Sequence, residues 1–331
     1  MIKTAVVGAG YWGPNVIRNL REVDGLVMAY CVELRQERRD FVQRRFPDVQ
    51  VCAALSDIVD EVDAVIIATP PTTHYSLALA ALQRGKHVLV DKPVVLNNLH
   101  AKHLSNEAAK NNLVLMGGHT FLYGGAIACI KKHLLAGDLG DLYYFESTRV
   151  NLGIMRNDVS VIWDLAPHDI SILEFLFNLK IQSVYAVGLN ARGTVHDTCY
   201  ITLTLNGGAI ALINIGWRSP VKYRRMVICG SKRMIVYDDM DAIEKVKIYS
   251  AGIDLADDPQ TLTERQLTYR TGEIFIPRLD TTENLQRQLE AFRDAIVSHT
   301  QPLSGPSHIQ RVTGIMSLIE IALQRGMPVC L

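Results

Sequence analysis

The first third of the chain alternates short apolar runs with segments that repeat their apolar residues at helical spacing. The apolar runs are "TAVVGAG", "GLVMAYCVE", "DAVIIAT", "HVLV" and, at 113–118, "LVLMGG". The helical patterns begin at Pro14, run from Arg38 to Arg45 and run from Ser76 to Arg84. Continuous apolar strands separated by helices are typical of parallel βαβ units whose sheet is buried on both faces. We therefore predict an α/β domain over residues 1–118.

From Leu142 onward the pattern changes to one typical of strands. The segments are "LYYFESTRVN", "SVYAVGLNA", "CYITLTLN", "AIALINIGW", "RMVICG" and "MIVYDD". In "ITLTLN" apolar and threonine positions alternate, and the "NGG" that follows provides hairpin chemistry. We predict a second domain at 119–331, built on an antiparallel meander with helices at 284–298 and 308–325, the last of which would pack back on the first domain. The polar, acidic segment at 251–266 is the least ordered candidate.

The segment "AIALINIGW", residues 209–217, is apolar on both faces of its predicted strand. We expect neither side of this strand to contact water, because large apolar faces are rarely left exposed. One face would take the helices of the domain and the other a partner subunit. The sequence therefore predicts a homodimer or homotetramer.

Length and composition narrow the function. The chain has 331 residues, and two domains are expected because a single core rarely grows beyond roughly 250 to 300 residues. Lys plus Arg (34) equals Asp plus Glu (34), so we expect a small-molecule ligand and no nucleic acid. Six cysteines are scattered singly, as is typical of reduced thiols in the cytoplasm. We expect neither secretion nor a membrane span, since the apolar stretches are too short.

A glycine-rich motif follows the first apolar run. Gly8, Gly10 and Gly13 form a GxGxxG that opens the first predicted helix, with Pro14 where a first helical turn tolerates proline. Such glycines permit a tight turn and a close approach of the backbone to a pyrophosphate at the helix N-terminus. Glu33 ends the second apolar run 20 residues after Gly13. In this context the motif predicts a dinucleotide site rather than a plain turn.

The residue types around Glu33 bear on the choice of cofactor. Glu33 would accept hydrogen bonds from the adenosine ribose and repel a 2′-phosphate, which favours NAD over NADP. Arg35, Arg38 and Arg39 follow and leave two interpretations open, neutralisation of a phosphate or a solvated helix face. We favour the solvated face and expect NAD, with NADP as the less favoured cofactor.

Three segments together resemble the Gfo/Idh/MocA oxidoreductases. They are the GxGxxG, "ATPPTTHYSLALAALQRGKHVLVDKP" at 68–93 and "WDLAPHDISIL" at 163–173. The resemblance covers nearly the whole chain and is most specific in the middle segment. It implies a Rossmann domain followed by an α+β domain with a large open, mostly antiparallel sheet, whose other face often makes the oligomer contact.

The resemblance also assigns residues to the cofactor, with two departures. The chain has Asp91 where the family usually has glutamate, and Ala166-Pro167 where the second motif usually has more flexible positions. The implied cofactor residues are Gly8, Gly10, Tyr11, Trp12, Gly13, Glu33, Leu34, Thr69, Pro70, Pro71, His74, Asp91, Lys92 and Pro93. His74 would line the nicotinamide pocket or, equally well, merely begin a helix.

The oxidation of a secondary alcohol by a nicotinamide needs a base for the hydroxyl proton and a donor that stabilises the developing alkoxide. His168 suits the first role because histidine titrates near neutrality, and Lys92 suits the second. Lys92 follows the strand "HVLV" at the sheet edge where dinucleotides bind. We expect His168 to open an apolar helix, with Pro167 in its first turn. The N-terminus of that helix would favour the neutral imidazole.

Two further positions have alternative interpretations. Asp164 stands four residues before His168, where it would orient the imidazole ring or cap the helix, and the resemblance favours the first role. The predicted catalytic residues are therefore Lys92, His168 and Asp164. His100 and His103 have i, i+3 spacing but no third ligand in the sequence nearby, so we expect an exposed helix face and no metal.

Residues around the second motif suit a polyhydroxylated ring. The candidates for substrate binding are Lys92, Tyr123, Arg149, Asn151, Arg156, Trp163, Asp164 and His168, with Tyr144 nearby in sequence. "VNLG" with "WDLAPHD" is similar to family members that modify sugars in surface-polysaccharide or antibiotic pathways, where a ring hydroxyl, often at C3, becomes a ketone. The resemblance implies a sugar or nucleotide-sugar dehydrogenase, with a cyclitol or aminoglycoside dehydrogenase as the nearest alternative. A cofactor-sensing regulator is disfavoured because Lys92 and His168 are both retained.

Overall fold

The computed structural model describes residues 1–153, 156, 158–178, 180–191, 195–255 and 267–330. Most of the acidic segment that we expected to be least ordered, residues 256–266, lies outside these ranges. The chain divides into two compact units. Unit 1 comprises Met1–Gly124, Asn157–Phe175 and Thr281–Ser317, and unit 2 comprises Gly125–Arg156, Leu176–Asp280 and Leu318–Leu331.

Unit 1 contains a six-stranded parallel sheet in the order β3-β2-β1-β4-β5-β6. The strands are β1 Ile2–Val7, β2 Leu26–Val32, β3 Gln50–Cys52, β4 Ala64–Ile67, β5 His87–Asp91 and β6 Leu115–Gly118. The prediction of a parallel sheet is confirmed. The strand order reverses between β1 and β4, and in sheets of this kind the dinucleotide binds at that switch point, outside the carboxyl ends of the strands.

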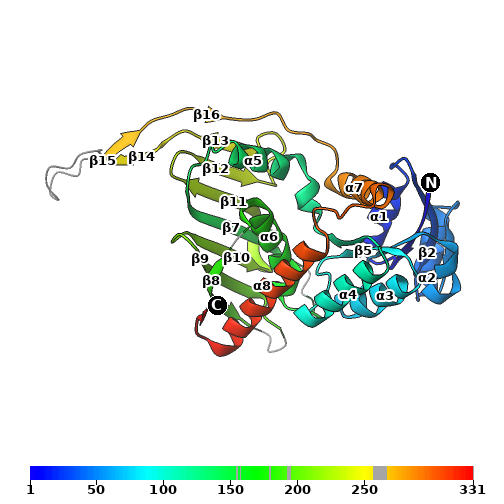
Figure 1. The fold of residues 1–331 in the computed structure, drawn as a ribbon. Coiled ribbons are helices and arrows are strands. Elements are labelled where there is room, and N and C mark those ends of the chain that lie inside the picture. The colour runs from blue at the N-terminus through cyan, green and yellow to red at the C-terminus, as the bar shows by residue number, and fades with distance from the viewer. Residues whose placement is uncertain (154–155, 157, 179, 192–194, 256–266, 331) are drawn as a thin grey trace. The chain divides into compact units, whose positions relative to one another are not determined.

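Helices cover both faces of this sheet. They are α1 Gly13–Leu20, α2 Gln36–Arg45, α3 Pro71–Gln83, α4 Asn98–Lys110 and α7 Asn284–Ser298, with short 3-10 helices at Leu55–Asp57, Val59–Glu61 and Thr120–Tyr123. One core joins Val6 of β1 to Ile17 of α1 and Phe292 of α7. The other joins Val65 of β4 to the side chains of α3 and α4, which lie side by side (Figure 1). Each large apolar side chain buried in these cores stabilises the fold by about 1.5–3 kcal/mol. A strand whose residues are apolar on both sides therefore gains most in a sheet covered on both faces.

Unit 2 contains a nine-stranded, mostly antiparallel sheet in the order β16-β13-β12-β11-β7-β10-β9-β8-β17 (Figure 1). The strands are β7 Leu142–Leu152, β8 Ile181–Leu189, β9 Thr198–Leu205, β10 Ile210–Gly216, β11 Arg218–Gly230, β12 Met234–Asp238, β13 Val246–Tyr249, β16 Ile274–Phe275 and β17 Val329–Cys330, while β14 Gly252–Leu255 and β15 Leu267–Arg270 pair with each other. The predicted open, mostly antiparallel sheet is confirmed.

The prediction of a simple meander is wrong at one point. β7 lies between β10 and β11, and it runs parallel to β10. Only Trp217 separates β10 from β11, and a one-residue connection is too short for a two-residue hairpin between them. The chain instead passes around the end of β7 before it returns as β11. Hydrophobic alternation along a strand does not reveal which strand is its neighbour.

The two faces of β10 differ in exposure. Ala211, Ile213 and Ile215 are buried, whereas Ile210 and Leu212 are 41% and 42% exposed. The exposed side continues onto β8 and β9 through Tyr185, Val187, Leu189 and Tyr200. In the single chain one face of this strand is thus in contact with water, and this is the face that the sequence analysis expects a partner subunit to cover.

The remaining helices are α5 Gly125–Leu135, α6 Val161–Phe177 and α8 Pro306–Arg325. The helices predicted at 284–298 and 308–325 are confirmed as α7 and α8. Across the part of the chain that the structure describes, no helix combines the length and apolar character needed to cross a bilayer.

Candidate active site

The glycines of the loop between β1 and α1 have different structural roles. A Cβ on Gly8, whose φ is +101°, would lie 2.5 Å from the carbonyl oxygen of Ala68, and one on Gly13 would lie 2.1 Å from that of Gly8. A Cβ on Gly10 would meet nothing within 4 Å. Gly8 and Gly13 are therefore required by the turn and its packing, while Gly10 keeps the outer side of the loop clear. This division matches what a bound pyrophosphate requires.

The N-terminus of α1 is open to an anion. Its N-cap is Trp12, which provides no side-chain hydrogen bond, and its first turn contains no acidic residue. Pro14 has no N–H, and the N–H groups of Asn15 and Val16 donate to the carbonyl oxygen of Trp12, which leaves the amide of Gly13 for another acceptor. The helix dipole favours a negative charge there. Tyr11 is 89% exposed, whereas Trp12 packs partly against the core.

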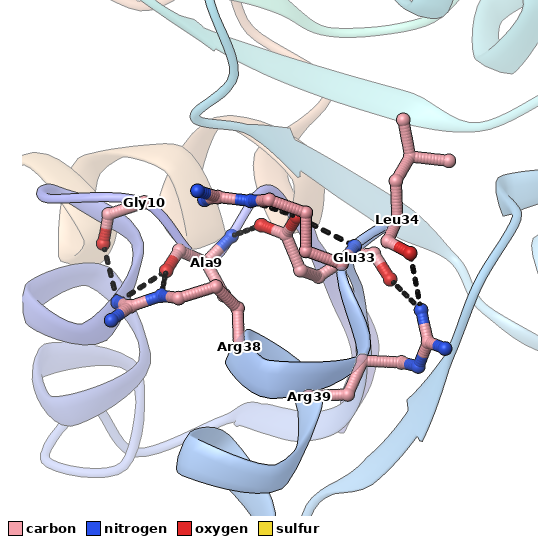
Figure 2. Close-up of polar contacts among 7 residues, drawn as sticks. Ala9, Gly10, Glu33, Leu34, Arg38 and Arg39 are labelled. Atoms are coloured by element: carbon pink, nitrogen blue, oxygen red, sulfur yellow. Dashed lines mark hydrogen bonds and ion pairs between the residues drawn. The ribbon is translucent and has the colours of Figure 1, made fainter.

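The carboxylate of Glu33 is buried at the end of β2 beside this loop (Figure 2). Oε2 accepts the backbone N–H of Ala9 at 2.9 Å, and Oε1 accepts the backbone N–H of Arg35 at 3.1 Å and its side-chain Nε at 3.2 Å. Burial by itself would raise the pKa of Glu33, but these hydrogen bonds outweigh it and lower the pKa. Glu33 is therefore ionised at neutral pH.

The three arginines after Glu33 do not form a uniform solvated face. Arg35 is exposed, but Arg38 and Arg39 are half-buried. Both donate hydrogen bonds to backbone carbonyl oxygens, Arg38 to the glycine-rich loop and Arg39 to the end of β2 (Figure 2). The solvated-face interpretation is therefore wrong for these two residues. The sequence shows only a run of charges on a helix. A tertiary contact with backbone oxygens cannot be predicted from such a run.

His74 connects two strand ends of the Rossmann sheet. It lies in α3, which begins at Pro71, and its side chain is fully buried. Nε2 lies 2.8 Å from the carbonyl oxygen of Thr69 after β4, and Nδ1 lies 2.8 Å from that of Pro93 after β5. His74 therefore connects the Thr-Pro-Pro loop to the Asp-Lys-Pro loop.

Lys92 follows β5 and contacts α6. Its Nζ donates to the backbone carbonyl oxygen of Asp164 at 2.8 Å and lies 3.2 Å from the carboxylate oxygen Oδ1. The side chains of Lys92 and Asp164 are only 19% and 16% exposed. A strand-end lysine that pointed into water would have no reason to be held in this way, because burial of an ammonium group is costly unless it is paired.

The helix that carries the second motif begins earlier than expected. α6 starts at Val161, so Asp164 lies in its first turn and Pro167 inside it. The prediction that His168 opens the helix, with Pro167 in its first turn, is wrong, and the less favoured alternative that Asp164 caps the helix does not hold either. The helix-terminus argument for a neutral imidazole therefore no longer applies. Pro167 removes one backbone donor, but burial of Trp163, Ala166 and Ile170 stabilises the helix through this position.

Asp164 and His168 are four residues apart on α6 and therefore share a face of the helix. The ring of His168 packs edge-on against Phe121, with centroids 5.1 Å apart and planes at 81°. We refer to Lys92, Asp164 and His168 as the lysine cluster. It combines an ammonium donor, a carboxylate and an imidazole at the carboxyl edge of the sheet.

Two buried histidines near the lysine cluster were missed by the sequence analysis. His119 follows β6 and is 3% exposed, and its ring meets that of His308 edge-on at 5.4 Å. Nε2 of His308 lies 2.9 Å from Oγ of Ser171 on α6. Burial, with a smaller effect of the charges of His308 and Lys92, holds the pKa of His119 well below its usual value. The available signal was positional, since His119 ends the strand next to that of Lys92.

The predicted substrate residues fall in both units. Trp163 is buried in unit 1, and the hydroxyl of Tyr123 lies 2.8 Å from Oγ of Ser304 and accepts the backbone N–H of Ser304 at 3.1 Å. Burial raises the pKa of Tyr123. The hydroxyl of Tyr123 therefore already has a structural partner. The other predicted residues belong to unit 2 and are Tyr144, Arg149, Asn151 and Arg156.

Known protein families contain the same two domains. The NAD-binding Rossmann fold of the GFO/IDH/MocA oxidoreductase family matches residues 2–119, and the GFO/IDH/MocA C-terminal domain matches residues 127–236. The UDP-N-acetylglucosamine 3-dehydrogenase of Acidithiobacillus ferrooxidans is 31% identical over 258 residues, which cover 76% of this chain and 78% of that enzyme. The chain belongs to the Gfo/Idh/MocA oxidoreductases. It is thus a member of a family of NAD(P)-dependent dehydrogenases that act on CH–OH groups.

Other relatives and solved structures extend the likeness. The myo-inositol 2-dehydrogenase of Thermotoga maritima is 22% identical over 254 residues, 72% of this chain and 76% of that enzyme. A structure of the Acidithiobacillus ferrooxidans UDP-N-acetylglucosamine 3-dehydrogenase superposes with a TM-score of 0.84 at 25% identity, covering 98% of each chain. A gentamicin A biosynthesis protein, solved in complex with NAD, has a TM-score of 0.84 at 20% identity over 100% of this chain and 96% of that one, which shows a shared fold.

Proposed function

We propose that this protein is an NAD-dependent dehydrogenase that oxidises a ring secondary hydroxyl, at C3, of a sugar or nucleotide sugar to a ketone, or catalyses the reverse reduction. The observation that carries the proposal is the lysine cluster, in which Lys92 contacts Asp164 and His168 lies four residues further along the same helix. A donor and a base on one side of the sheet edge are the two groups that alcohol oxidation needs.

The chemistry divides between these residues. Lys92 donates a hydrogen bond to the substrate oxygen and stabilises the negative charge that develops on it. His168 accepts the hydroxyl proton, and Asp164 holds the ammonium group of Lys92 in place. NAD, held at the glycine-rich loop, would supply the acceptor for the hydride that leaves the carbinol carbon. In the reverse reaction His168 returns the proton to the alkoxide.

The residues of the glycine-rich loop fit a dinucleotide, and Glu33 favours NAD. Its ionised carboxylate, held by Ala9 and Arg35, suits the ribose hydroxyls and repels a 2′-phosphate. Arg38 and Arg39 are both committed to backbone carbonyl oxygens. Neither guanidinium group is therefore available to bind the 2′-phosphate of NADP.

The substrate class rests on the relatives and on the residue types. A UDP-N-acetylglucosamine 3-dehydrogenase is among them, and the donors that we assign to the substrate, Arg149, Asn151 and Arg156, suit a polyhydroxylated ring with an anionic group. A cyclitol is the second candidate, favoured by the likeness to myo-inositol 2-dehydrogenase. We propose that the enzyme works in the cytoplasm.

We further propose that the protein forms a homodimer or homotetramer through the exposed face of the unit 2 sheet. Ile210, Leu212 and Tyr200 contribute apolar surface there. Leu212→Glu should lower the mass measured by light scattering, while Val297→Glu, at a 69% exposed position in α7, should leave it unchanged. A wild-type protein that is monomeric at micromolar concentration contradicts this proposal.

A substrate screen tests the main proposal. The protein should first be shown to bind NAD by its rise in melting temperature. Sugars, nucleotide sugars and cyclitols are then offered with NAD, and NADH formation is followed by absorbance. We expect turnover with a nucleotide sugar such as UDP-N-acetylglucosamine. Turnover with cyclitols alone favours the second candidate, and NAD binding with no turnover on any of the compounds favours a cofactor sensor.

A further inference from the structure

Three consecutive peptide groups of the glycine-rich loop are held by the side chains of Glu33, which follows β2, and of Arg38 in α2. The N–H of Ala9 donates to Oε2 of Glu33 at 2.9 Å. The carbonyl oxygen of Ala9 accepts Nε and Nη2 of Arg38 at 2.8 and 2.6 Å, and that of Gly10 accepts Nη2 at 3.0 Å (Figure 2). The guanidinium group thus grips two successive carbonyl groups on one side of the loop.

This grip also orients the amides on the other side. In a trans peptide group the C=O and N–H bonds are coplanar and point in opposite directions. Because the carbonyl oxygens of Ala9 and Gly10 face Arg38, the N–H groups of Gly10 and Tyr11 face away from it. Gly10 has no neighbouring atom within 4 Å of where a Cβ would stand, so the loop is open at this position. Successive amides that point the same way form an anion-binding concavity.

We propose that Arg38 is a positioning residue for the pyrophosphate of the cofactor. Its planar fork holds the carbonyl side of the glycine-rich loop, so that the amides of Gly10 and Tyr11 are presented to the pyrophosphate before the cofactor arrives. The guanidinium carbon also lies 4.6 Å from the centroid of the Phe41 ring, which supports the side chain from its face. A loop ordered in advance binds more tightly because less freedom is lost on binding.

Arg39 provides a matched control for Arg38. It is adjacent on α2, has the same charge and also donates to two backbone carbonyl oxygens, but these belong to Glu33 and Leu34 at the end of β2. Loss of either arginine removes one positive charge from the same neighbourhood. Only the loss of Arg38 releases the glycine-rich loop.

The test is the dissociation constant of NADH and of NADPH, measured by calorimetry for the wild type and for Arg38→Met, Arg38→Lys and Arg39→Met. We expect Arg38→Met to raise the dissociation constants of both cofactors by about tenfold or more. The factor should be the same for both, because the pyrophosphate is common to them. Arg38→Lys should stay closer to Arg38→Met than to the wild type, since an ammonium group lacks the fork. Arg39→Met should change both constants by less than about threefold.

Three outcomes contradict the proposal. Unchanged affinities in Arg38→Met show that the loop does not need the arginine. A selective loss of NADPH shows that Arg38 contacts the 2′-phosphate directly. An equal loss in Arg39→Met shows a general effect of charge. If Arg38→Met does not fold, Arg38→Lys decides alone, and wild-type affinity in that variant overturns the proposal. Wild-type protein that binds NADH tightly but oxidises no sugar contradicts the proposed substrate and leaves this inference intact.

Discussion

The glycine-rich loop and the lysine cluster lie in the same unit but are assembled over different distances along the chain. Contacts of the loop join residues 24 and 29 positions apart, Ala9 with Glu33 and with Arg38, all within the segment from β1 to α2. The contact of Lys92 with Asp164 spans 72 positions. The loop therefore depends on local folding, whereas the lysine cluster forms only when α6 packs against the completed sheet. Changes in one region should affect cofactor affinity and changes in the other should affect turnover.

The largest separation of the two regions is expected for His168→Ala. Removal of the base should lower turnover by about a hundredfold or more and flatten its pH dependence near neutrality. The dissociation constant of NADH should change by less than about threefold, because the contacts that hold the glycine-rich loop come from Glu33 and Arg38. Initial rates across pH 6 to 9 check the first point and calorimetry the second. His103→Ala, at an exposed position of α4, is the control and should behave as the wild type.

Acid should weaken the region behind the lysine cluster before it affects Glu33. Burial, with a smaller effect of Arg311, lowers the pKa of His308 to about 4, whereas histidine in an unfolded chain titrates near 6.5. Above pH 6.5 both states are neutral. As the pH falls towards 4 the unfolded state binds the proton first, so the free energy of unfolding decreases, by about 2 kcal/mol at pH 5 for this residue alone. His119, shifted in the same direction, adds to the loss.

Urea unfolding at pH 7 and at pH 5 measures this effect. His308→Gln keeps a hydrogen-bonding group near Ser171 but no titration in this range, so it should lose clearly less stability than the wild type between the two pH values. Equal losses in the two proteins would mean that His308 is not held neutral by the fold. Glu33 has a lowered pKa, and its contribution is lost only at more acidic pH.

A smaller effect is expected for the acid beside the glycine-rich loop. Glu33→Gln removes the charge that repels a 2′-phosphate and keeps an acceptor for the N–H of Ala9. The preference for NADH over NADPH, measured as a ratio of dissociation constants, should fall by about tenfold. Turnover at saturating NADH should change little. A wild type that prefers NADPH, or a ratio that does not move in the variant, contradicts the role given to Glu33.

The sequence predicts best where function is local. Five of the six strands of unit 1, the GxGxxG and Glu33 were identified from short patterns, because each depends on neighbours close in sequence. The three-residue strand β3, Gln50–Cys52, was not identified, because it is too short to show a pattern. The start of α6 was not, because the local preference of Pro167 for a first turn is overridden by burial of Trp163 and Ala166. Arg38 and Arg39 were misjudged for a related reason, since their partners are backbone oxygens whose position only the folded chain supplies.

The same limit applies to the unit 2 sheet and to His119. The alternation in β10 predicts a strand, but the insertion of β7 between β10 and β11 depends on pairing with a segment far away in sequence. The position of His119 near Lys92 becomes apparent only once β5 and β6 are known to be neighbours. Long-range pairing is therefore what the sequence lacked in both places.

The most direct test of the central claim is the turnover of Lys92→Ala, of His168→Ala and of the double variant at saturating NAD, with NAD affinity measured in each. Lys92→Ala should lose about a hundredfold or more in turnover while it binds NAD as the wild type does. The double variant should lose less than the product of the two single effects, because both groups act on one proton transfer. A Lys92→Ala protein with undiminished turnover on its substrate would contradict the account.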